Sequence, residues 1–153
     1  MTESPHTELQ HHVYLSLGSN LGDKKENLRQ AIHALQSQVG SLVACSAFIA
    51  TEPWGFDSEN TFLNAAVHLT TQLTPCQLLI ATQQIERLLG RTSKSCNKEY
   101  HDRTIDIDIL TYDTMHIDET FTHDGLQLSL TLPHPLMHER DFVMIPLRQI
   151  CFD

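Results

Sequence analysis

Two aspartates, Asp106 and Asp108, alternate with isoleucines in the segment from Arg103 to Leu110. A period of two is typical of a β-strand, on which successive side chains point to opposite faces. Both aspartates would then lie on one face, about 6.6 Å apart. Such a pair favours a cation, and Mg²⁺ is commonly bound by one or two carboxylates together with substrate phosphates. Because Arg103 could hold a phosphate, the segment predicts a metal-dependent phosphate-transfer site.

The same alternation also fits an ordinary strand with one buried and one solvated face. The basic residues bear on this choice, since five of the ten Lys and Arg lie between Arg87 and Arg103 in a chain of net charge −9. A basic segment beside paired aspartates indicates a local polyanion site. The alternative is a clustering of cations at the C-terminus of a helix, where they are favoured. The acidic net charge argues against nucleic acid and anionic membranes as partners.

Length and composition indicate one soluble domain, with 153 residues of which 41% are hydrophobic and 19% charged. The cysteines form no C-x-x-C pair, so neither a zinc site nor a dithiol redox site is predicted. Since no signal peptide and no run of 18 apolar residues is found, we expect a cytoplasmic protein. We expect a flexible tail over residues 1–12 and a single domain over residues 13–153.

The predicted elements alternate between strands and helices. Helix starts are indicated by Asp23, with Glu26 to complete a capping box, and by Thr74-Pro75-Cys76-Gln77. The predicted strands cover residues 13–17, 42–51, 62–71 and 105–109, and the two helices between them end at Gly40 and Gly90. This β-α-β-β-α-β order is that of the ferredoxin-like unit, an α+β fold with an antiparallel sheet and helices packed on one side.

The segments outside that core are less regular. Residues 53–61 and 91–102 are predicted loops, the second of them polar and basic. Residues 113–131 suggest either a hairpin or a loosely ordered excursion. Residues 137–150 predict a helix that is interrupted near Pro146, because proline lacks the N–H that a helix interior needs.

Several motifs occur together in an order that resembles a known family, 6-hydroxymethyl-7,8-dihydropterin pyrophosphokinase of folate biosynthesis. They are Leu17-Gly18-Ser19-Asn20, Phe62 to Val67, Ile85-Glu86 through Gly90-Arg91, Arg103 to Leu110, and Leu132-Pro133-His134-Pro135. The resemblance covers about residues 13–150. It implies a ferredoxin-like fold and the transfer of diphosphate from ATP to the hydroxymethyl group of the pterin, with release of AMP. It also implies two Mg²⁺ ions.

The resemblance places the triphosphate chemistry on residues of this chain. It implies that Asp106 and Asp108 bind both Mg²⁺ ions and that, with Arg91 and Arg103, they form the catalytic set. The residues implied for ATP binding are Glu86, Arg91, Lys94, Arg103, Ile109 through its backbone, Thr131, His134 and Arg140. Cationic and hydrogen-bonding groups of this kind would neutralise charge on the phosphate oxygens.

The resemblance also implies a pterin site. Phe62 and Phe142 would stack on the flat bicyclic ring, and Asn64 carries both a donor and an acceptor for its edge. Thr51 and the backbone near Trp54 would complete the hydrogen bonds. No side chain is an obvious general base, which fits phosphoryl transfer, since positioning and electrostatics dominate that reaction.

This chain departs from the family pattern over residues 93–102, where a cation of the family is missing and whether Lys98 replaces it stays open. Two other functions stay open. One is a nucleotide- or pterin-binding module that has kept the fold and lost turnover. The other is a Mg²⁺-dependent kinase that acts on a different flat heterocycle.

Overall fold

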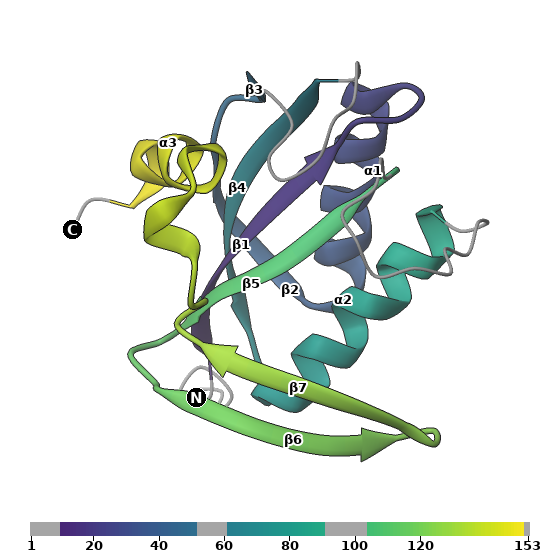
Figure 1. Ribbon diagram of the computed structural model, residues 1–153, viewed down its shortest axis with the longest axis vertical. Helices are drawn as coiled ribbons and strands as arrows, with labels where there is room; N and C mark the ends of the chain where they lie inside the picture. The colour runs from purple at the N-terminus through teal and green to yellow at the C-terminus, as the bar shows by residue number, and fades with distance from the viewer. Residues whose placement is uncertain (1–9, 52–60, 91–103, 152–153) are drawn as a thin grey trace, which may run out of the picture.

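The computed structural model describes residues 10–51, 61–90 and 104–151 (Figure 1). Its elements in chain order are β1 (His11–Ser19), α1 (Lys24–Gln38), β2 (Gly40–Cys45), β3 (Ile49–Thr51), β4 (Phe62–Thr71), α2 (Pro75–Gly90), β5 (Asp106–Tyr112), β6 (Ile117–His123), β7 (Leu126–Leu132) and α3 (Asp141–Ile150). A 3-10 turn over Met137–Glu139 precedes α3.

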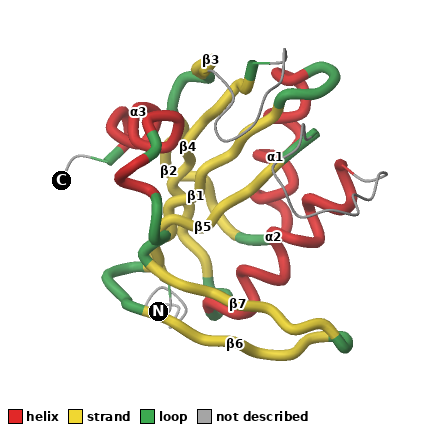
Figure 2. The backbone as a smooth tube through the Cα atoms, viewed as in Figure 1, coloured by secondary structure: helices red, strands yellow, loops and turns green. Residues whose placement is uncertain are grey.

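The main sheet has the strand order β2-β4-β1-β5, with the short β3 paired to β4, and all these pairings are antiparallel. The predicted α+β ferredoxin-like fold is confirmed. Strands β1 and β4 lie in the middle, so β5 forms one border of the sheet. The hairpin of β6 and β7 is a separate two-stranded sheet that crosses below β5 and α2 in the view of Figures 1 and 2.

The two faces of the sheet are covered by different helices. Val13, Leu15 and Leu17 of β1, with Ile107 and Ile109 of β5, are buried in the main core with α1 and α2. The opposite face carries a smaller core that joins α3 to Ala66 of β4 and Leu110 of β5 (Figure 2). The expectation that the two core helices pack on one side is therefore confirmed for α1 and α2. The third helix, α3, which was predicted outside that core, buries its apolar side on the other face.

Both predicted helix starts are capped by side chains. The Oδ1 atom of Asp23 accepts a hydrogen bond from the backbone N of Glu26 at 3.2 Å. Thr74 and Gln77 form a reciprocal pair, since the backbone N of Thr74 donates to Oε1 of Gln77 at 2.9 Å and the backbone N of Gln77 donates to Oγ1 of Thr74 at 3.2 Å. Such caps satisfy N–H groups that have no partner within the helix.

Several boundaries differ from the predictions. β1 begins at His11, two residues earlier than expected, and residues 1–9 of the expected tail lie outside the described part. The predicted strand over 42–51 is two strands, β2 and β3. α3 continues through Pro146, so the predicted interruption there is wrong. The break occurs instead at Arg140, whose backbone is extended with φ −120° and ψ 109°.

The segment over 113–131 contains a hairpin, which was one of its two predicted forms. Its tip is Asp124-Gly125, with φ of 53° and 78°. Positive φ at both central residues is typical of the tight turns that join antiparallel strands, and Asp-Gly is a favoured pair there. None of the helices in the described segments is long and apolar enough to span a membrane.

Candidate active site

The paired aspartates lie on β5, on the face opposite to the main core. Ile107 and Ile109 are each 6% exposed within that core, whereas Asp106 and Asp108 are half-buried. The predicted division of the strand into an isoleucine face and an aspartate face is therefore confirmed. Within the described residues, β5 pairs only with β1 in the main sheet, so its other edge is open to groups from α2 and β7.

Glu86 of α2 reaches that edge. Its Oε2 atom accepts a hydrogen bond of 2.7 Å from the backbone N of Ile107. In an antiparallel strand, the N–H and C=O of one residue point to the same side, and those of every second residue share that side. The backbone groups of Ile109 therefore also face away from β1, toward the space where the resemblance places the adenine.

A cavity of about 350 Å³ occupies this space, between the edge of β5, α2 and β7. Six of the predicted site residues line it: Glu86, Asp106, Asp108, Ile109, Thr131 and His134. Its volume is in the lower part of the range for small-molecule sites. The side chain of Thr131 is held within the hairpin, where its hydroxyl donates to Oδ1 of Asp118 at 3.4 Å.

His134 follows β7 and is tied to β5, because its backbone N donates to the carbonyl of Leu110 at 2.9 Å. The backbone N of Leu136 donates to Nδ1 of the ring at 3.3 Å, so the neutral ring carries its proton on Nε2. Burial and, to a smaller extent, the charge of Arg140 lower the pKa of His134, while Asp106 opposes them. His134 is therefore a neutral N–H donor near neutral pH.

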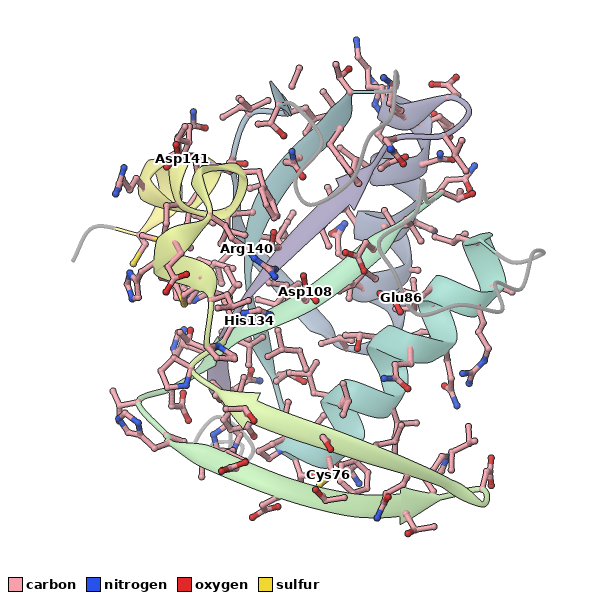
Figure 3. All side chains as sticks on the ribbon, in the orientation of Figure 1. Cys76, Glu86, Asp108, His134, Arg140 and Asp141 are labelled. Carbon is pink, nitrogen blue, oxygen red and sulfur yellow. The ribbon has the colours of Figure 1, made fainter. Side chains whose placement is uncertain are left out.

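Arg140 stands at the start of α3 and is 7% exposed. Its guanidinium lies 5.6 Å from the ring centre of Phe142, within the range of a cation–π contact. In Figure 3, Arg140 and His134 approach Asp108 from the α3 side, and Glu86 lies beyond β5 on α2. The fold thus places cationic and imidazole donors opposite the carboxylates.

A second group of predicted residues lies on β3 and β4. Thr51 and Phe62 are paired across these strands, and the Nδ2 atom of Asn64 donates to Oγ1 of Thr51 at 2.6 Å. Asn64 is only 2% exposed. Phe142, in the first turn of α3, packs against the smaller core between α3 and the sheet. These four residues therefore lie on the face of the sheet that also carries Asp106 and Asp108.

Four predicted site residues lie outside the described part of the chain: Trp54, Arg91, Lys94 and Arg103. Lys98 lies outside it as well.

The cavity also has lining residues that were not predicted, among them Gln83 and Ser129. Gln83 is one turn before Glu86 on α2, so its place on the same helix face was a signal available in the sequence. Ser129 is two residues before Thr131 on β7, and the period of a strand places it on the same side.

The carboxylates fit the expected metal. Among residues 10–51, 61–90 and 104–151, no three His, Cys, Asp or Glu converge as ligands. Mg²⁺ does not need such a set, because it commonly takes one or two carboxylates and fills its other positions with water and substrate phosphates. Asp106 and Asp108 line the cavity and would supply those carboxylates.

Paired carboxylates can hold a metal ion, and an arginine and an imidazole N–H facing them can neutralise phosphate oxygens, so this site has the groups that a metal-assisted phosphate-transfer protein needs. Residues 14–152 match the model of the 7,8-dihydro-6-hydroxymethylpterin-pyrophosphokinase family. The chain belongs to this family.

Named relatives agree with the match. A 2-amino-4-hydroxy-6-hydroxymethyldihydropteridine pyrophosphokinase of Porphyromonas gingivalis is 50% identical over 139 residues, which are 90% of this chain and 89% of the relative. The enzyme of the same name from Bacillus subtilis is 40% identical over 140 residues, or 91% of this chain and 77% of that one. The expected family and enzyme class, an ATP-dependent diphosphotransferase of folate biosynthesis, are confirmed.

Solved structures show the same fold. The chain resembles an HPPK-DHPS in complex with substrates with a TM-score of 0.70 at 15% identity, covering 92% of this chain and 40% of that one. For the wild-type Plasmodium falciparum HPPK-DHPS with pteroate, the TM-score is 0.67 at 14% identity, and 88% of this chain and 37% of that one are covered. The chain therefore spans about two fifths of these larger proteins.

Proposed function

We propose that this chain transfers diphosphate from ATP to the hydroxymethyl group of 6-hydroxymethyl-7,8-dihydropterin and releases AMP. The observation that carries the proposal is the cavity at the edge of β5, which brings Glu86, Asp106, Asp108 and His134 together from three separate parts of the chain. The curated relatives named as pyrophosphokinases of this pterin support the choice of substrate.

In the proposed complex, ATP occupies the cavity between β5 and β7. In this proposal the outward backbone groups of Ile109 form hydrogen bonds to the adenine edge, and Glu86 of α2 binds the sugar. The Nε2–H of His134 and the guanidinium of Arg140 face the triphosphate. The backbone N of Leu136 holds the ring of His134, and burial holds the side chain of Arg140, before the ligand binds. Little reorganisation of these two side chains is therefore required in the reaction.

The pterin is proposed to lie beside Asn64, between the rings of Phe62 and Phe142. Asn64 is fixed by Thr51, so its amide is presented in one orientation. A fixed amide beside aromatic rings suits a flat heterocycle whose edge has both donors and acceptors.

Asp106 and Asp108 would hold the Mg²⁺ that accompanies ATP, and two ions remain the proposed number. Bound there, Mg²⁺ would neutralise charge on the triphosphate oxygens. The hydroxymethyl oxygen forms a bond to the β-phosphorus, and the bond from that phosphorus to the oxygen bridging the α-phosphorus breaks. AMP leaves, and the hydroxyl proton passes to solvent. The residues of the chain act by orienting the two substrates, which is the main requirement of phosphoryl transfer.

The nucleotide product tests the proposal. Purified protein with Mg²⁺, ATP and the hydroxymethyl pterin is expected to form AMP and the pterin diphosphate in equal amounts. Formation of ADP would indicate a kinase with another chemistry. Binding of both ligands without turnover would indicate the binding module, and either result would contradict the proposal. The cytoplasmic location and the division into a tail and a domain stay predictions.

A further inference from the structure

Gly18 of β1 lies between the two halves of the proposed site. In the pairing of β1 with β4 its partner is Asn64, and in the pairing of β1 with β5 its partner is Asp106. The three residues form one row across three strands. Because neighbouring strands are about 4.8 Å apart, Asn64 and Asp106 are separated by about 10 Å, with only a glycine between them.

The backbone does not explain why this position is a glycine. In the described part of the chain, the glycines with positive φ are Gly22 and Gly125, so Gly18 has a conformation that any residue can adopt. Glycine inside a strand is destabilising, since it loses more conformational freedom on folding and has no side chain to pack. Such a glycine often marks a close approach of another group to the backbone.

The close group here is the amide of Asn64. A Cβ atom on Gly18 would lie 2.9 Å from Oδ1 of Asn64 and 3.5 Å from Cδ1 of Phe62. The first distance is too short for a carbon–oxygen contact. An exposed amide would simply rotate away, but Asn64 is 2% exposed and its Nδ2 is held by Thr51 at 2.6 Å. A methyl group on Gly18 therefore has to displace a fixed amide.

We propose that Gly18 is a positioning residue for the pterin: its missing side chain lets the Asn64 amide lie fixed over β1, on the path from the pterin pocket to the paired aspartates. The inference rests on the proposed function. Gly18 acts through Asn64, because the atoms nearest an added Cβ belong to Asn64 and Phe62 and not to its other neighbour Asp106. Its substitution should therefore affect the pterin and spare the nucleotide.

The test is Gly18→Ala, with calorimetric binding of 6-hydroxymethylpterin in the presence of saturating Mg²⁺ and α,β-methylene-ATP. We expect pterin binding to weaken about tenfold to a hundredfold, as for an overpacked buried site. Binding of the Mg²⁺–nucleotide analogue alone should change by less than about twofold, because the atoms nearest the added methyl group belong to Asn64 and Phe62 and not to Asp106. Equal losses for both ligands, or an unchanged pterin affinity, would overturn the inference.

A double-mutant cycle with Asn64→Ala provides the control. Asn64→Ala removes the amide that the new methyl group would meet, so adding Gly18→Ala to it should change pterin affinity by no more than about twofold. Gly18→Ala alone could fold too poorly for binding measurements, so the same cycle is also measured by thermal unfolding. The double variant should then have the melting temperature of Asn64→Ala. Additive losses in both readouts would show that Gly18 acts independently of Asn64.

AMP formation by the wild-type protein distinguishes a failure of the proposed function from a failure of the inference about Gly18. If it forms no AMP, the proposed function fails whatever the variants do. If it forms AMP while Gly18→Ala retains normal pterin affinity, only the inference about Gly18 fails.

Discussion

The carboxylate of Glu86 accepts a hydrogen bond of 2.7 Å from the backbone N of Ile107. A side chain of α2 thereby caps a backbone N–H at the outer edge of β5, the strand that contains Asp106 and Asp108. Strand edges otherwise leave N–H groups without a partner from the sheet. The contact links α2 to the strand of the paired aspartates and orders one wall of the cavity at the edge of β5.

Removal of this contact should destabilise the fold. Glu86→Ala leaves a part-buried N–H without its acceptor, and we expect a loss of about 1–3 kcal/mol in the free energy of unfolding, measured in urea. Glu86→Gln keeps an acceptor oxygen and should lose less. Glu119→Ala, at an exposed position on β6, is the control. The interpretation fails if Glu86→Ala is no more destabilising than Glu119→Ala.

The paired aspartates should be required for turnover and dispensable for folding. Asp106→Asn and Asp108→Asn keep the shape of each side chain and remove its charge, so we expect the AMP-forming rate to fall at least about a hundredfold with an unchanged melting temperature. Asp124→Asn makes the same chemical change at the hairpin tip, where the side chain is 85% exposed, and should leave the rate unaltered. Near-normal rates for the first two variants would refute the metal assignment.

The protonation of His134 should respond to its two charged neighbours in opposite directions. Burial and Arg140 lower its pKa below the ordinary 6.5, while Asp106 raises it. Arg140→Gln should therefore raise the pKa of His134, and Asp106→Asn should lower it further. NMR titration of the ring nitrogens measures these shifts and also reports whether the neutral ring carries its proton on Nε2. Shifts in the same direction in both variants would contradict the arrangement.

A histidine that does not line the cavity, His68, should make stability depend on pH. His68 is stacked on Tyr14 and its Nε2 lies 2.8 Å from Nδ1 of His12. Burial and, secondarily, the charge of His12 lower the pKa of His68 below 6.5 in the folded state. The unfolded chain therefore takes up a proton first as the pH falls through 6.5, and the free energy of unfolding should decrease below that pH.

His68→Gln removes this proton uptake, so its stability should change less between pH 7.5 and pH 5 than that of the wild type. His116→Gln, at an exposed position, serves as the control. Chemical unfolding across the pH range measures the slopes. Equal slopes for the wild type and His68→Gln would rule out the proposed linkage.

Local patterns in the sequence determined much of the fold. The caps at Asp23 and Thr74 were predictable because a cap involves residues only three apart. The isoleucine and aspartate faces of β5 followed from the period of a strand. The predicted interruption at Pro146 was wrong, because Pro146 is buried within α3 along with Leu147 and Ile150, and this burial outweighs the missing N–H.

The sequence by itself determined the order of the elements, the paired carboxylates on one strand face and, through its ordered motifs, the family. Only the tertiary structure decided that Gly18 separates Asn64 from Asp106, that Glu86 binds the backbone of Ile107, and that α3 covers the second face of the sheet. These relationships join residues far apart in the chain. They depend on which strands pair and in which register, and that is set by the packing of the whole core.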